Sequence, residues 1–271
     1  MDNKRIEELK FIAQEVQKDV LRMVGLARSG PFETSMAAAN LLVYLYWEEL
    51  LLVPETPRRE DRDRFVMDLP AAVPALYAVL ARRGYFEREH LWHYRRLGAM
   101  LQALPDYRRT PGIDAPCVTA EPALAMASAL AGALRRGADS PRVVIMTDES
   151  AFPSKVFAEE LRFAGRAFAS NLIMIALSRK ADAGSRCENE KLLGSCGWQT
   201  RTANSEDWLS LEAAFSSFDY SAAAPKALLV FANAELGLFV TDAAKRSPAH
   251  VLSMGELDQA LEELEVKSNE R

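Results

Sequence analysis

Short apolar runs rich in β-branched residues alternate with amphipathic segments in the second half of this 271-residue chain. The runs at 143–146, 172–177 and 227–232 read as strands, and the segments at 155–169 and 206–218 read as helices. Strands that alternate with helices are joined by right-handed crossovers, so they lie parallel in one sheet with helices on both faces. The sequence therefore predicts an α/β fold with a mainly parallel sheet.

Helical patterns dominate the first half of the chain. Apolar periodicity predicts helices at 1–30, 36–52, 74–83, 87–104 and 120–136, a short strand at 64–69 and a last helix at 253–266. The segment between residues 177 and 193 is expected to be a loop. Because neither a repeat nor a low-complexity linker interrupts the pattern, we expect residues 1–271 to form a single domain.

Composition narrows the classes of partner. The net charge is −5 and both signs are interspersed, which disfavours a nucleic-acid partner bound through a basic surface. The arginines between Arg58 and Arg64 have acids among them and are expected to be salt-bridged. No apolar run reaches the roughly 18–20 residues of a membrane-spanning helix. Three cysteines in no close-spaced pair indicate a reduced, cytoplasmic protein.

The strand at 143–146 runs into a polar segment, Thr147-Asp148-Glu149. An open α/β sheet places its ligand chemistry at such strand ends. No glycine flanks Asp148, although a loop that cradles phosphate usually contains glycine. Asp148 is therefore either a metal ligand or an acid that caps the turn after the strand.

Two further pairs carry reactive side chains. His90 and His93 lie three residues apart on a predicted helix and form either a metal pair or a surface pair near aromatic residues. Cys187 and Cys196 lie nine residues apart in the predicted loop and form either a redox pair or two unremarkable thiols.

Three stretches, in this order and spacing, resemble one known family. They are ARSG…SMAAANLLVYLYWEEL at 27–50, DRDRFVMDLPAAVPALYAVLARRGYF at 61–86 and LWHYRRLGAMLQALPDYRRTPGID at 91–114. They resemble the N-terminal half of transketolase, and the likeness runs from about residue 6 to about residue 265. It implies the thiamine-diphosphate-binding fold, in which this half grips the cofactor diphosphate and a pyrimidine-binding domain completes the site.

Several motifs of that family are altered here. The family's S-G-H-P-G-G-S, S-K-G-H-A-A-P, Q-G-H-P and G-S-L-G-Q-G read SGPFETS at 29–35, DLPAAVP at 68–74, QALP at 102–105 and VTAEPA at 118–123. Three histidines thus correspond to Pro31, Ala71 and Leu104. A side chain at Glu121 or Glu149 is expected to crowd and repel a diphosphate.

The family's metal motif, G-D-G followed by an asparagine, corresponds to Thr147-Asp148-Glu149 and Lys180. Asp148 is the one recognisable metal ligand, because an ammonium group cannot ligate Mg²⁺. Lys180 is either a surface lysine or a substitute for the metal that pairs with Asp148. We therefore expect no tightly bound cofactor, with thiamine diphosphate and Mg²⁺ bound only if the chain remains an enzyme subunit.

The resemblance leaves three functions open. The first is a non-catalytic subunit or scaffold that pairs with a transketolase-like partner, because the aligned proton donors are lost. The second is the N-terminal subunit of a divergent two-subunit thiamine-diphosphate-dependent enzyme, and the third is a small-anion sensor. The chain ends where the pyrimidine-binding domain would begin, so a separately encoded pyrimidine-binding and C-terminal subunit is expected. A homodimer is also expected, because the segment 36–52 is too apolar for a surface.

Overall fold

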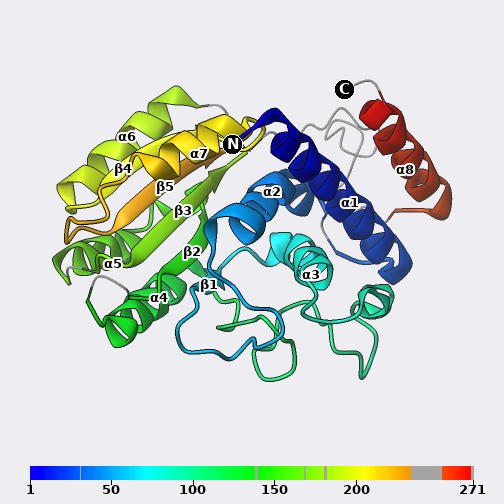
Figure 1. Cartoon of the computed structure of the whole chain (residues 1–271), viewed down its shortest axis with the longest axis horizontal. Helices are drawn as coiled ribbons and strands as arrows, with labels where there is room; N and C mark the ends of the chain where they lie inside the picture. Colours follow the sequence, from blue (N-terminus) through cyan, green and yellow to red (C-terminus); the bar gives the residue numbers. More distant parts are fainter. Residues whose placement is uncertain (31, 138–139, 168, 180–181, 233–251, 270–271) are drawn as a thin grey trace.

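Five parallel strands form the centre of the molecule (Figure 1). The computed structural model describes residues 1–30, 32–137, 140–167, 169–179, 182–232 and 252–269. The strands are β1 (Arg64–Met67), β2 (Val143–Asp148), β3 (Leu172–Ser178), β4 (Gln199–Asn204) and β5 (Lys226–Phe231). Their order in the sheet is β1-β2-β3-β5-β4, and every neighbouring pair is parallel. The predicted parallel sheet is confirmed.

Helices cover both faces of this sheet (Figure 1). They are α1 (Asn3–Ala27), α2 (Glu33–Tyr44), α3 (Val73–Arg82), α4 (Ala120–Leu134), α5 (Lys155–Arg166), α6 (Ala183–Ser195), α7 (Trp208–Ser216) and α8 (Met254–Asn269). The apolar sides of α1, α2, α3, α7 and α8 share one core with one face of the sheet, and α4, α5 and α6 share a second core with the other. None of the described helices is long and apolar enough to cross a membrane.

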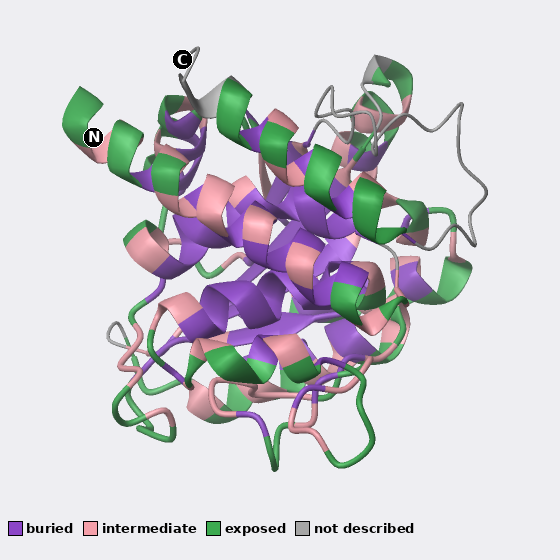
Figure 2. Cartoon of the chain, turned by 90° about the vertical axis from the view of Figure 1, so that its right-hand side faces the viewer, coloured by how far each residue is buried: buried purple, intermediate pink, exposed green. Residues whose placement is uncertain are grey.

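The side chains of each strand point alternately to the two faces of the sheet, which explains why there are two cores. In β2, Val144 and Met146 belong to the core under α1–α3, while Val143 and Ile145 belong to the core under α4–α6. All four are fully buried, because successive side chains of a strand point to opposite faces of the sheet. Figure 2 shows this buried interior beneath helices whose outer sides are exposed.

The apolar segment predicted as a helix at 36–52 is buried inside the chain itself. It forms α2 and a π-helix, Leu45–Glu49, and Leu41, Leu42 and Leu45 are inaccessible to solvent. Contacts with α1 and α3 cover this segment, so its apolar character does not require a second copy. The homodimer stays a prediction without that support.

Three sequence-based assignments are wrong. Residues 183–193, expected to be part of a loop, belong to α6, and β4 was not predicted at all. Both elements are polar. Among the described residues of α6, Leu193 is the one that is fully buried. β4 lies at the edge of the sheet and pairs with a strand on one side only. The helix predicted at 87–104 is a short 3₁₀ helix, Arg88–His93. Left-handed backbone at Arg95 (φ 60°) and Gly98 (φ 79°) ends it.

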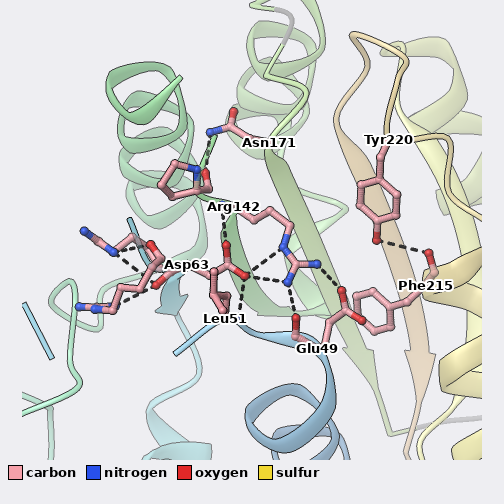
Figure 3. A network of polar contacts seen from close by, with 10 residues as sticks. Glu49, Leu51, Asp63, Arg142, Asn171, Phe215 and Tyr220 are labelled. Carbon is pink, nitrogen blue, oxygen red and sulfur yellow. Dashed lines mark hydrogen bonds and ion pairs between the residues drawn. The ribbon is translucent and has the colours of Figure 1, made fainter. Parts of the chain in front are cut away.

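An ion-pair network holds the amino ends of β1 and β2 together (Figure 3). Asp63, directly before β1, accepts hydrogen bonds from the backbone N–H of Arg142 (2.7 Å) and from its guanidinium Nη2 (2.7 Å). The same guanidinium pairs with Glu49 at the end of the π-helix. Asp63 also accepts from the backbone N–H of Leu51 (3.0 Å). One carboxylate thus joins two strands and the end of the π-helix.

Candidate functional site

Polar residues gather where β1, β2 and β3 end. Asp68 follows β1, Asp148 closes β2, and Arg179 follows β3 at the position after Ser178. Because the strands are parallel, their carboxyl ends meet at one edge of the sheet, the place where open α/β sheets bind ligands. This edge is the candidate site.

Asp68 is the most deeply buried carboxylate of this edge, with 8% of its surface exposed. Its Oδ2 accepts a hydrogen bond of 2.6 Å from the hydroxyl of Thr147, which is fully buried. Burial raises the pKa of Asp68 to about 7, the Thr147 hydrogen bond opposes that rise, and the charges of Asp148 and Glu121 add to it. The edge therefore has a negative potential that a cation would relieve.

Asp148 both caps the turn after β2 and faces a cation. Its Oδ1 accepts from the backbone N–H of Ser150 (2.9 Å), and its Oδ2 lies 3.8 Å from Nη2 of Arg179. Arg179 also donates to the hydroxyl of Thr34 in the first turn of α2 (3.3 Å). The capping interpretation of Asp148 is confirmed, and Oδ2 keeps lone pairs that a metal ion could use.

The predicted partner of Asp148, Lys180, lies outside the described residues. Its neighbour Arg179 makes an ion pair with Asp148. The sequence indicates that Asp68 and Arg179 lie near the strand ends, but it did not predict their contacts with Thr147 and Asp148. The available signal was their position, since each is the first residue after an apolar strand whose end reaches the ligand edge.

Both glutamates that replace motif glycines are held by other side chains of the chain. Glu121, in the first turn of α4, accepts from the hydroxyl of Ser154 (2.9 Å). Glu149 accepts from the side-chain amide of Asn189 on α6 (2.7 Å). Glu121 is thus held at the start of α5 and Glu149 at α6. Each carboxylate has a hydrogen-bond donor that offsets part of its charge.

No hydrogen bond or ion pair between described residues joins the other candidate pairs to this edge. His90 and His93 sit on the 3₁₀ helix, and no group of three potential metal ligands occurs among the described residues. Cys187 is exposed on α6, whereas Cys196 is buried at its end, and both are free thiols. Nine residues of helix separate them by about 13 Å, so they cannot form a disulfide without unwinding α6.

The Asp68→Asn variant is expected to be more stable than the wild-type chain at pH 8 in EDTA. Asp68 binds its proton more tightly in the native chain than in the unfolded chain, where its pKa is near 3.8. Each rise in pH between about 4 and 7 therefore favours unfolding of the wild type but not of the variant. The gain should be nearly absent at pH 4 and reach about 4 kcal/mol at pH 8. Urea denaturation at both pH values measures it, and an equal effect at both would contradict the assignment.

Comparison with known proteins identifies the fold and the family resemblance. Residues 10–140 match the sequence family described as "Transketolase, thiamine diphosphate binding domain". A transketolase from Campylobacter jejuni superposes with a TM-score of 0.74 at 17% identity, covering 100% of this chain and 48% of that one. The chain is similar to transketolase N-terminal domains in part of its sequence and in its fold. It spans about half the length of the solved transketolases.

Two relatives are named as subunits of transketolases. One is a subunit of the apulose-4-phosphate transketolase of Phocaeicola vulgatus, 25% identical over 234 residues, which are 83% of this chain and 82% of the relative. The other is the 6-deoxy-6-sulfo-D-fructose transketolase subunit SqwG of Clostridium sp. (strain MSTE9), 36% identical over 107 residues, 40% and 39% of the two chains. The predicted resemblance to a transketolase N-terminal domain or split subunit is confirmed.

The expectation that the chain binds no cofactor tightly is wrong. The matching family is the thiamine diphosphate binding domain itself, and relatives of this chain are transketolases and transketolase subunits. That expectation rested on Lys180 in place of a metal ligand and on crowding and repulsion by Glu121 and Glu149, whose carboxylates are held by Ser154 and Asn189. Loss of glycine from a motif does not by itself remove a cofactor site.

Proposed function

We propose that this chain is the thiamine-diphosphate-binding subunit of a two-subunit enzyme of the transketolase type. The observation that carries the proposal is the polar edge formed by Asp68, Asp148 and Arg179, at the ligand-binding end of a transketolase-like sheet. The match along 82% of the apulose-4-phosphate transketolase subunit supports the two-subunit organisation. The partner would supply the pyrimidine-binding domain that this half lacks.

The residues present fit a metal-bound diphosphate. Asp148 offers Oδ2 as a ligand to Mg²⁺, and the guanidinium of Arg179, itself 42% exposed, offers paired donors to a phosphate oxygen. When bound, thiamine diphosphate supplies a carbon centre that stabilises a carbanion. The chain's own residues hold and orient its diphosphate end.

Acidic residues outnumber the described basic ones at this edge, which makes the metal essential. The charges of Asp148 and Glu121 act on Asp68, and the described ion pair at this edge is that of Asp148 with Arg179. A bare diphosphate would be repelled, whereas a divalent cation neutralises both the carboxylates and the phosphates. Binding of the cofactor should therefore depend strictly on Mg²⁺.

Native mass spectrometry of the protein isolated from its own source, with thiamine diphosphate and Mg²⁺ present, tests the proposal. We expect a complex that contains a second subunit together with the mass of the cofactor. A homodimer, or a heteromer without cofactor mass, would reject it.

The Asp148→Asn variant is expected to bind thiamine diphosphate and Mg²⁺ at least about tenfold more weakly than the wild-type complex. Asparagine keeps an oxygen for the Ser150 N–H but loses the charge that attracts the metal. Isothermal titration calorimetry measures the change. Asp258→Asn, an exposed residue of α8, is the control and should bind as the wild type does. Equal affinities for all three proteins would remove Asp148 from the site.

A non-catalytic subunit is the second candidate. It is favoured by the residues at the aligned histidine positions, because Ala71 and Leu104 carry no proton donor and Leu104 is 49% exposed. General acid–base groups contribute roughly 10²–10⁴-fold each to a reaction. Assays of the isolated complex with ketose phosphates as donors separate the two candidates: turnover supports the enzyme, and bound cofactor without turnover supports the scaffold.

A further inference from the structure

Positive charge gathers around the loop 105–114, in a chain whose net charge is −5. Asp114 anchors the loop, since its carboxylate accepts from the guanidinium of Arg62 (2.9 Å from Nη1) and from the backbone N–H of Phe65 (3.0 Å). Phe65 lies near the amino end of β1, whereas the candidate site begins at Asp68, after the carboxyl end. The Asp114 end of the loop therefore contacts β1 near its amino end, whereas the proposed cofactor site lies at the carboxyl end of that strand.

Two hollows open beside this loop, which belongs to the long segment between α3 and α4 (Figure 1), and the second hollow also reaches residues that precede β1. The first, of about 670 Å³, is lined by His90, His93, Arg96, Leu97, Met100 and Arg109. The second, of about 490 Å³, is lined by Arg58, Arg62, Tyr107, Arg108, Arg109 and Thr110. Arg109 lines both, so the hollows adjoin.

Most of these arginines have no carboxylate partner. Within the described part of the chain, no carboxylate lies at ion-pairing distance from Arg58, Arg96, Arg108 or Arg109, whereas Arg62 pairs with Asp114. The expectation of a salt-bridged surface is met by neighbours such as Arg59, which pairs with Asp61, but not by Arg58. Asp106 offsets part of this charge, and its Oδ1 accepts from the backbone N–H of Arg108 (2.9 Å).

The walls hold groups suited to an oxyanion. Guanidinium groups bind phosphate oxygens in pairs, and within the described residues the guanidinium of Arg109 makes one long hydrogen bond, from Nη2 to the carbonyl of Gly98 (3.5 Å). Thr110 is 2% exposed, and its hydroxyl has no partner among the described residues. An unpaired polar group in the wall of a hollow is the kind of group that a missing ligand explains.

We propose that the two hollows form a binding site for a small molecule that carries a diphosphate group, bound at Arg109, which lines both hollows. Their volumes fall within the range of roughly 300–1,000 Å³ that small-molecule sites occupy. The site is separate from the carboxyl edge of the sheet and does not depend on the proposed function.

Titration calorimetry with pyrophosphate, in EDTA and at low ionic strength, tests this site. The wild-type chain is expected to bind one pyrophosphate, and more tightly than it binds orthophosphate. Arg109→Gln should weaken binding at least tenfold, and Arg108→Gln should weaken it as well. Arg166→Gln, an exposed residue at the end of α5, removes the same charge elsewhere and should change nothing.

Four outcomes would overturn the proposal. These are absence of pyrophosphate binding to the wild type, equal binding of pyrophosphate and orthophosphate, equal weakening by Arg109→Gln and Arg166→Gln, and loss of binding in Arg179→Gln alone. The last would place the anion at the carboxyl edge of the sheet and leave the proposed function standing. If the proposed function is wrong, the native complex will contain no cofactor mass, whereas pyrophosphate binding will be unaffected.

Discussion

Gly165→Ala is expected to lower the free energy of unfolding by about 3 kcal/mol. A Cβ at this position of α5 would lie 1.8 Å from the carbonyl oxygen of Cys196, at the end of α6. The obstacle is backbone, so neither helix can make room without moving away from the other. We expect a melting temperature lower by roughly 6–12 °C, measured by circular dichroism.

The matched control for this variant is Gly132→Ala in α4. Nothing lies within 4 Å of a Cβ at Gly132, so alanine there removes chain entropy without a clash. It should leave the melting temperature unchanged or raise it slightly. If Gly165→Ala and Gly132→Ala have the same melting temperature, α5 and α6 do not pack as closely as described.

Asp63→Ala should cost about 3–5 kcal/mol of stability. The carboxylate, 5% exposed, accepts from Leu51 and from both the backbone and the guanidinium of Arg142. Without it, the half-buried Arg142 keeps Glu49 as its described carboxylate partner, and two backbone N–H groups lose their acceptor. The midpoint of guanidinium denaturation measures the loss.

Asp61→Ala is the control, because Asp61 is an exposed acid of the same connection that pairs with Arg59 at the surface. No measurable change is expected there. Equal midpoints for the two variants would mean that Asp63 contributes nothing beyond a surface ion pair.

Apolar periodicity was sufficient to predict four of the strands and most helices. β2 and β3 are buried on both faces and read as continuous apolar runs, which is what a central parallel strand requires. The same reasoning missed β4 and α6, because an edge strand and a surface helix can be built from polar residues. It also extended a helix through Arg95, whose left-handed backbone no periodicity reveals.

The candidate site could be predicted only in part. Asp148 was found from its place in a motif, and its role as a cap follows from the turn it enters. The contact between Asp68 and Thr147 joins residues 79 positions apart, and it depends on how β1 aligns with β2. The pairing of Asp148 with Arg179 depends in the same way on β2 and β3. Strand register, which no single sequence segment encodes, decides both contacts.

The ion-pair network that joins β1 and β2 lies at the amino ends of these strands, around Asp63 and Arg142, and the proposed cofactor chemistry lies at their carboxyl ends. Substitutions at the ligand edge therefore leave the clamp that stabilises the sheet untouched. A lineage can exchange histidines and glycines there, one at a time, without passing through an unfolded intermediate. The separation gives this architecture freedom to acquire new substrates while its scaffold persists.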